Sequence, residues 1–309
     1  MKNILVTGGA GYIGSVLTDT LLIKGYNVTV IDNLSRGIQP LVQHCNHKAF
    51  SFAYGDVRDR SLMQKLVAKA DAIIALAAIV SPKTCAIDPM LTESVNLDSI
   101  KLLNSLRGKN QPLLFPNTNI GYGAKMRQDI YDEISPMEPN SHYGITKVAA
   151  ENAIREHGEY VIFRLASIFG ASPAMKWHLL LNFYVYKALT EGQLIVYQQD
   201  YKRNFLHIRD LCDGFIYALE HFDAVKNEVY NIGLDAGNVT KRQLVELVKG
   251  HIPSLYIHYA EVASDPDARD YLVSNAKLQQ KGFTPKISLE EGIEEMMKYH
   301  SMLPPLPQL

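Results

Sequence analysis

The first half of the chain alternates short apolar runs with longer segments whose apolar residues recur at helical spacing. The apolar runs, which are typical of buried parallel strands, lie at residues 3–6, 27–31, 72–76, 113–115 and 160–165. The helical segments between them lie at residues 12–24, 61–69, 92–106 and 143–157. This alternation predicts an α/β fold built on a doubly wound parallel sheet of the Rossmann type.

The pattern becomes mixed after about Gly170, where short strands at 194–197 and 256–259 alternate with further helices. We therefore predict a Rossmann domain at 1–170 and a smaller mixed α/β domain at 171–309. Part of the later chain, near 204–235, is expected to return to the first domain.

A glycine-rich turn joins the first strand to the first helix. Gly8, Gly11 and Gly14 allow a tight turn, close approach of the backbone to a pyrophosphate, and close packing of helix on strand. The second strand ends at Asp32, with Asn33 beside it, at the spacing expected for a carboxylate on the adenosine ribose. Because Asp32 repels a 2′-phosphate, the motif favours NAD over NADP, although the nearby Arg36 leaves NADP open.

Composition narrows the class of protein further. Of 309 residues, 47% are hydrophobic and 20% charged, as in an ordinary globular protein, and a net charge of −1 gives no case for nucleic acid or a membrane surface as partner. Cys45, Cys85 and Cys212 have no metal-like spacing, so we expect no metal site and a reducing, cytoplasmic location. The chain begins on a core strand, so no signal peptide is expected, and the proline-rich residues 304–309 are expected to form a loose extension.

Tyr143 and Lys147 are four residues apart on a predicted helix and so share one face. A lysine ammonium near a phenol favours the phenolate, which lets a tyrosine act as a base. Such a pair by itself also occurs by coincidence on helices. The pair gains significance from the glycine turn, because that turn would bind a dinucleotide next to such a base.

These motifs resemble the extended short-chain dehydrogenase/reductases that act on nucleotide sugars, the NAD-dependent epimerase/dehydratase family. The resemblance covers nearly the whole chain and rests on further motifs in order: Gly55-Asp56-Val57-Arg58-Asp59, Leu76-Ala77-Ala78, Asn96, Thr118 before Tyr122-Gly123, Arg164 before Phe169-Gly170, Arg203 to Asp210, and Tyr230-Asn231-Ile232-Gly233. Within the family, Pro116-Asn117-Thr118-Asn119 and Arg269-Asp270-Tyr271 look most like a bacterial subgroup that oxidises C4 of GDP-activated heptoses.

The resemblance implies a role for each matching residue. Tyr143 would take the proton of the sugar C4 hydroxyl, Lys147 would lower the pKa of that tyrosine and hold the nicotinamide ribose, and Thr118 would hydrogen-bond the sugar oxygen. The implied NAD-binding residues are Gly8, Gly11, Tyr12, Ile13, Gly14, Asp32, Asn33, Asp56, Val57, Leu76, Ala77, Ala78, Asn96, Tyr143 and Lys147. The implied contacts to the nucleotide sugar, made largely by the smaller domain, are Ser167, Asn182, Arg203 and Arg269.

Some of these residues also have ordinary structural readings. Asp56 could cap a turn, Asn96 could satisfy backbone groups at a corner, and Thr118 could simply end a strand. One departure from the family is informative, because Asn119-Ile120 follows Thr118 where dehydratases of the family carry an Asp-Glu pair. Elimination of water needs an acid and a base, so we expect no 4,6-dehydratase activity.

The sequence therefore predicts an enzyme that oxidises C4 of a nucleotide-diphosphate sugar with NAD to give a 4-keto sugar, a 4-dehydrogenase whose substrate the resemblance suggests is a GDP-heptose. A 4-epimerase that retains its NAD uses the same residues and stays open. A non-catalytic nucleotide-binding protein on the same fold is a third alternative, disfavoured by the presence of Tyr143 and Lys147. The resemblance also implies a homodimer, formed through the helices predicted at 92–106 and 141–157.

Overall fold

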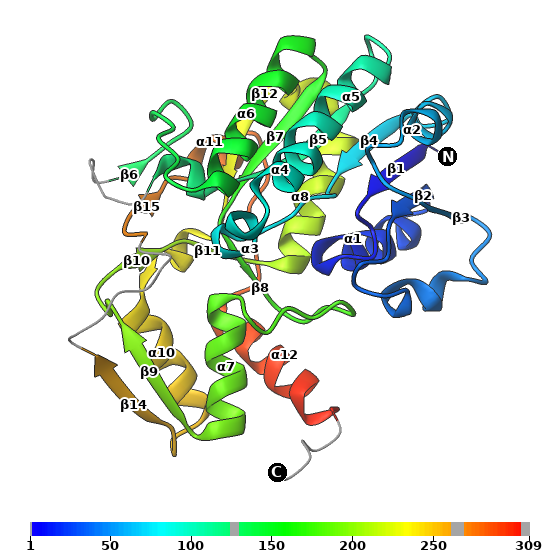
Figure 1. The fold of residues 1–309 in the computed structure, drawn as a ribbon. Coiled ribbons are helices and arrows are strands. Elements are labelled where there is room, and N and C mark those ends of the chain that lie inside the picture. Colours follow the sequence, from blue (N-terminus) through cyan, green and yellow to red (C-terminus); the bar gives the residue numbers. More distant parts are fainter. Residues whose placement is uncertain (1, 124–129, 261–268, 304–309) are drawn as a thin grey trace.

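The computed structural model describes residues 2–123, 130–260 and 269–303. The proline-rich segment at 304–309 lies outside these described residues. Figure 1 shows two parts of the molecule: a large sheet with its helices in the upper part of the view, and α7, α10 and α12 with the strand pair β9 and β14 in the lower part.

Seven parallel strands form the central sheet and confirm the predicted doubly wound α/β class. In spatial order they are β12 (Glu228–Ile232), β7 (Tyr160–Leu165), β5 (Leu113–Thr118), β4 (Ala72–Ala75), β1 (Asn3–Thr7), β2 (Asn27–Asp32) and β3 (Phe50–Tyr54). The chain order reverses beside β1, with β2 on one side and β4 on the other. In open α/β sheets, ligands bind outside the carboxyl ends of the strands at such a reversal.

The two faces of the sheet are covered by different helices. Ile4 and Val6 of β1 pack in one core cluster with α1 (Tyr12–Ile23) and α8 (Ile208–Glu220), whereas Leu5 packs in another with α2 (Arg60–Val67), α5 (Ser99–Leu106) and α6 (His142–His157). Alternate side chains of a strand point to opposite faces, which explains the continuous apolar runs of the sequence. Each fully buried aliphatic side chain contributes about 1.5–3 kcal/mol to folding.

The lower part has a core of its own, made by three helices. These helices, α7 (Leu180–Glu191), α10 (Lys241–His251) and α12 (Leu289–Ser301), bury a cluster that includes Val185, Leu244 and Ile293. Local sequence sets where α12 begins, because Ser288 and Glu291 form a reciprocal capping box at its N-terminus. The parallel pair β9 (Gln193–Tyr197) and β14 (Tyr256–Ala260) packs on α7 and extends this part.

The remaining elements are short. The helical ones are η1 (Gln39–His44), α3 (Pro82–Ile87), α4 (Pro89–Glu93), η2 (Ser94–Asp98), η3 (Asn119–Tyr122), α9 (Phe222–Val225), η4 (Asp235–Gly237) and α11 (Ala276–Gln280). The strands are β6 (Ile130–Tyr131), β8 (Ser167–Phe169), β10 (Lys202–Arg203), β11 (Phe205–His207), β13 (Val239–Thr240) and β15 (Leu272–Val273).

The segment near 204–235 contributes β12 to the central sheet and α8 to the face that α1 covers. The division into units at 1–170 and 171–309 remains a proposal. The strand β3 was not among the predicted strands, since it lies at the sheet edge and none of its side chains is fully buried. The helix predicted at 92–106 is interrupted by one π turn, η2, which contains Asn96.

Candidate functional site

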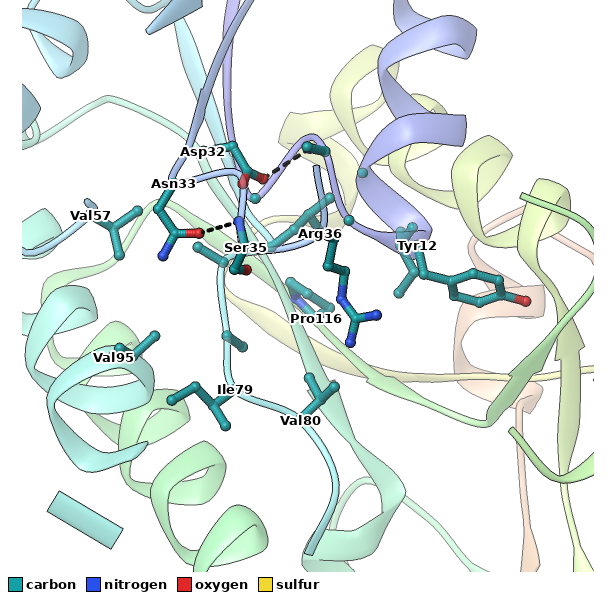
Figure 2. Close-up of a pocket in the computed structure, with 18 of the residues that line it drawn as sticks. Tyr12, Asp32, Asn33, Ser35, Arg36, Val57, Ile79, Val80, Val95 and Pro116 are labelled. Carbon is teal, nitrogen blue, oxygen red and sulfur yellow. Dashed lines mark hydrogen bonds between the residues drawn. The ribbon is translucent and has the colours of Figure 1, made fainter. Parts of the chain in front are cut away.

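A pocket of about 560 Å³ opens at the carboxyl ends of the central strands. Its lining comes from the glycine turn, from the residues that follow β2, β3 and β4, from the end of β5 and from α6 (Figure 2). The structure thus brings together most of the predicted cofactor residues, namely Gly8, Gly11, Tyr12, Ile13, Gly14, Asp32, Asn33, Asp56, Val57, Leu76, Ala77, Ala78, Tyr143 and Lys147.

The glycine turn is possible only with glycine at two of its positions. Gly8 has φ of +74°, and a Cβ on it would lie 2.7 Å from the backbone nitrogen of Ala77. A Cβ on Gly14 would lie 2.2 Å from the carbonyl oxygen of Gly8. The turn can therefore pack directly against the loop after β4 and against the start of α1, whose unpaired N–H groups face the pocket.

Replacing Gly14 by alanine is expected to open this turn, because the new methyl group meets backbone atoms rather than a flexible side chain. We expect a loss of about 1–3 kcal/mol in the free energy of unfolding, measured by urea denaturation, and a loss of dinucleotide binding. Gly250→Ala is the matched control, since nothing lies within 4 Å of the added carbon on α10 and a helical alanine is favourable. Wild-type stability and binding in the Gly14 variant would contradict this account of the turn.

Asp32 fixes the loops on both sides of it. Its Oδ2 accepts a hydrogen bond of 2.9 Å from the backbone of Ala10 in the glycine turn, and its Oδ1 accepts one of 2.8 Å from the backbone of Leu34. Asn33 similarly accepts from the backbone of Ser35 at 3.1 Å. Figure 2 shows the hydrogen bonds accepted by Asp32 from Ala10 and by Asn33 from Ser35 at the upper edge of the pocket. Each carboxylate oxygen can still accept from a ligand hydroxyl, because it has a further lone pair.

Asp56, after β3, is held in the pocket wall by Arg58. The two side chains form a paired contact, with Nη2 to Oδ2 at 2.6 Å and Nε to Oδ1 at 2.8 Å. This hydrogen bonding from Arg58 lowers the pKa of Asp56, so its carboxylate is charged at neutral pH. The implied contact of Asp56 with NAD would therefore be made by an oriented, ionised acceptor.

Helix α6 places Tyr143 and Lys147 in the same pocket. Ser141 caps the helix by accepting from the backbone of Gly144, which sets the start of the helix just before Tyr143. Lys147 is only 3% exposed, and its Nζ lies 3.6 Å from the centroid of the Phe115 ring. Burial lowers the pKa of Lys147 to about 7, against the opposing effect of Glu151.

The electrostatics of Tyr143 differ from the expectation that Lys147 holds its pKa down. Burial raises the pKa of Tyr143 above its usual range, Cys85 adds to this, and the charge that lowers it belongs to Arg269. The phenol therefore keeps its proton in the protein alone, since the cost of desolvating a phenolate outweighs the nearby positive charge.

Thr118 ends β5 beside the pocket wall formed by Pro116 and Asn117. It is 8% exposed, and its Oγ1 accepts a hydrogen bond of 3.2 Å from the backbone of Ile120. Because the oxygen serves as the acceptor in this contact, the O–H group can still donate to another oxygen. Thr118 itself does not line the pocket in the described structure.

A buried polar network ties the end of β5 to α6 and β7. Glu151 of α6 accepts from Asn117 and from Arg164, whose Nη2 lies 2.7 Å from Glu151 Oε1. Arg164 also donates to the hydroxyl of Tyr122 at 3.1 Å, and that hydroxyl donates to Asn231 of β12 at 2.6 Å. The network fixes the strand that carries Thr118 against the helix that carries Tyr143 and Lys147.

Besides Thr118, five predicted site residues lie outside the pocket lining. Asn96 donates to the backbone oxygen of Ile79 and accepts from its nitrogen, which favours the structural reading: it holds the loop after β4 in place. Asn182 is fully buried and contacts Gly170, Tyr12 and the backbone of Lys176. This position favours a structural role over contact with the nucleotide sugar.

The other three lie in or beside short strands. Ser167 is in β8, and Arg203, 3% exposed, is in β10. Arg269 lies beside β10, since the neighbouring Asp270 accepts from the backbone of Lys202 at 2.9 Å, and its charge reaches Tyr143. Of the three, Arg269 is therefore the one whose charge acts on a side chain that lines the pocket, namely Tyr143.

Several lining residues were not predicted as site residues, among them Arg36, Arg58, Lys176 and His178. Arg58 stands in a recognised motif and could have been found from it. Lys176 and His178 lie between β8 and α7, in a segment without regular periodicity, so no sequence pattern marks them.

A parallel sheet with a glycine turn, a carboxylate after β2 and a Tyr-Lys pair in one pocket is the arrangement of a dinucleotide-dependent enzyme of the short-chain dehydrogenase/reductase type. A family model described as the NAD dependent epimerase/dehydratase family matches residues 4–233. The chain belongs to this family. Membership confirms the predicted resemblance, the expectation of an enzyme and the expectation of NAD as its cofactor.

Individual relatives cover nearly the whole chain. UDP-glucuronic acid decarboxylase 1 of Danio rerio is 28% identical over 97% of this chain and 73% of its own length. A putative UDP-glucose 4-epimerase of Methanocaldococcus jannaschii is 27% identical over 96% of this chain and 97% of its own. The crystal structure of a UDP-glucose 4-epimerase from Thermotoga maritima with UDP-glucose is similar with a TM-score of 0.83 and 27% identity, covering 97% and 98% of the two chains.

Within the described ranges, none of the helices combines the length and hydrophobicity that crossing a bilayer requires. Across those same residues, no group of three or more His, Cys, Asp or Glu side chains is arranged to hold a metal ion.

Proposed function

We propose that this protein oxidises C4 of a nucleotide-diphosphate sugar with NAD to give a 4-keto sugar. The observation that carries the proposal is the pocket itself, in which Tyr143 and Lys147 of α6 face the glycine turn and the loop after β4. A base placed beside a dinucleotide site is the arrangement needed to remove a proton and a hydride from one carbinol.

In the proposed mechanism, Thr118 donates a hydrogen bond to the oxygen of the C4 hydroxyl, and Tyr143 removes the proton of that hydroxyl. When bound, oxidised NAD supplies the hydride acceptor and a positive charge. Lys147 holds the nicotinamide ribose, and its position above Phe115 limits its movement. The positive charge of Arg269 favours the phenolate and opposes the effect of burial on the Tyr143 pKa.

The residues after Thr118 argue against a following elimination. Asn119 and Ile120 are 3% and 8% exposed, and the backbone oxygen of Asn119 accepts a hydrogen bond of 2.6 Å from Tyr271. Neither side chain can transfer a proton to a C6 hydroxyl or from C5. We therefore propose that the 4-keto sugar is not dehydrated.

We propose a net 4-dehydrogenase, with a GDP-activated heptose as the substrate favoured by the resemblance at Pro116-Asn117-Thr118-Asn119. A 4-epimerase that retains NAD is the second candidate, favoured by the 4-epimerases among the relatives. Both reactions begin with the same oxidation and use the same side chains. We also propose a homodimer, on the family resemblance alone.

A panel of GDP-, UDP-, CDP- and dTDP-sugars distinguishes these outcomes by the mass and NMR spectra of the products. We expect a product lighter by two hydrogen atoms, formed in quantity when a 2-oxo acid is present to reoxidise bound cofactor. A product of equal mass and inverted C4 indicates the epimerase. A product lighter by one water contradicts the proposal, because Asn119 and Ile120 cannot carry out the proton transfers that elimination requires.

A further inference from the structure

Three cationic or titratable side chains other than the catalytic pair line the pocket and lie close enough to influence one another's charge. Arg36 comes from the loop after β2, whereas Lys176 and His178 come from the segment between β8 and α7. Figure 2 shows the Arg36 guanidinium pointing into the pocket, between Pro116 and the start of α1 at Tyr12. Lys176 Nζ lies 6.0 Å from the centroid of the Tyr12 ring.

The segment that carries Lys176 is fastened to the N-terminus of α1. The Tyr12 hydroxyl donates to the backbone oxygen of Gly170 at 2.8 Å and accepts from Asn182 at 3.2 Å. Ser172 donates to the backbone oxygen of Tyr12 at 2.8 Å, and Asn182 donates to the backbone oxygen of Lys176 at 3.0 Å. These buried contacts at both ends of the segment fix the position of Lys176 relative to the glycine turn.

Holding these charges together is unfavourable without an anion. Burial and then the charge of Arg36 lower the pKa of Lys176 to about 8. Burial and then the charges of Lys176 and Arg36 lower the pKa of His178. A bound phosphate oxygen would offset both effects, because it supplies the opposite charge at the point where the cations converge.

We propose that Lys176, together with Arg36, binds the pyrophosphate of the dinucleotide and so adds to the contacts made by the glycine turn. The inference rests on the proposed function, since it requires NAD in this pocket. The ligand is then held by the start of α1 and by a segment outside the Rossmann elements. Contacts from both elements slow dissociation, which favours a cofactor that stays bound through turnover.

Lys176→Gln tests the proposal by direct binding rather than by activity. Isothermal titration calorimetry measures the binding. The probes are NAD, NADP, ADP and adenosine, of which adenosine alone lacks phosphate. We expect about ten-fold weaker binding of NAD and ADP, with adenosine unchanged, and recovery in Lys176→Arg. Lys187→Gln on α7, which does not line the pocket, is the matched control.

The outcomes separate this inference from the function on which it rests. If the wild-type protein binds NAD and the Lys176→Gln variant binds NAD and ADP equally well, the pyrophosphate contact is overturned while the function stands. Selective loss of NADP binding also overturns it, because that would place Lys176 at a 2′-phosphate. Failure of the wild-type protein to bind NAD overturns both.

Discussion

Replacing Tyr143 by phenylalanine is expected to lower turnover by about 10²–10⁴-fold while leaving NAD binding intact. The phenylalanine ring fills the same space on α6 but has no hydroxyl to accept the C4 proton. The measurement is the rate of product formation at saturating nucleotide sugar, together with NAD affinity from isothermal titration calorimetry.

A matched tyrosine variant separates the lost hydroxyl from a general effect of substitution. Tyr256 is 64% exposed on β14 and does not line the pocket, so Tyr256→Phe should leave turnover unchanged. If Tyr143→Phe turns over at the wild-type rate, Tyr143 is not the base. If it loses NAD as well, its role is structural rather than catalytic.

Replacing Glu151 by leucine is expected to cost about 3–5 kcal/mol of the free energy of unfolding. The Glu151 and Arg164 side chains are 2% and 4% exposed, so removal of one partner leaves a buried charge without its counterion. The lost hydrogen bond from Asn117 also releases the end of β5 next to Thr118, so activity should fall together with stability. Urea denaturation measures the stability change from the midpoint at constant slope.

Two further variants test whether the buried ion pair is the cause of the lost stability. The double variant Glu151→Leu/Arg164→Met should recover part of the loss, because it removes both buried charges together. Glu191→Gln, which breaks the exposed pair with Lys187, should cost at most about 1 kcal/mol. A Glu151→Leu variant as stable as this surface variant would mean that the network does not hold α6 to β5.

The Rossmann half of the molecule was predictable because each element had a clear local cause. Strands β1 and β7 are continuous apolar runs buried on both faces, and the glycines at 8 and 14 are required by φ or by close backbone contact. The pocket residues after these strands follow from the same pattern, since the carboxyl ends of parallel strands meet at one edge.

The rest of the site depends on contacts between distant segments, which sequence spacing does not contain. Lys176 reaches the pocket only because Tyr12, Ser172 and Asn182 form hydrogen bonds across about 160–170 residues of chain. The raised pKa of Tyr143 likewise depends on tertiary burial, so a four-residue spacing to Lys147 could not predict it. Strand β3 was missed because none of its side chains is fully buried, so its sequence does not form a continuous apolar run.

The most direct test of the central claim follows the hydrogen on C4. The enzyme is mixed rapidly with NAD and with the nucleotide sugar that the panel identifies, either unlabelled or deuterated at C4. We predict that deuterium slows the appearance of reduced nicotinamide and is recovered on the nicotinamide ring, or back at C4 if the enzyme is an epimerase. Loss of the deuterium to solvent, or product formation without reduced nicotinamide at any time, would contradict oxidation at C4.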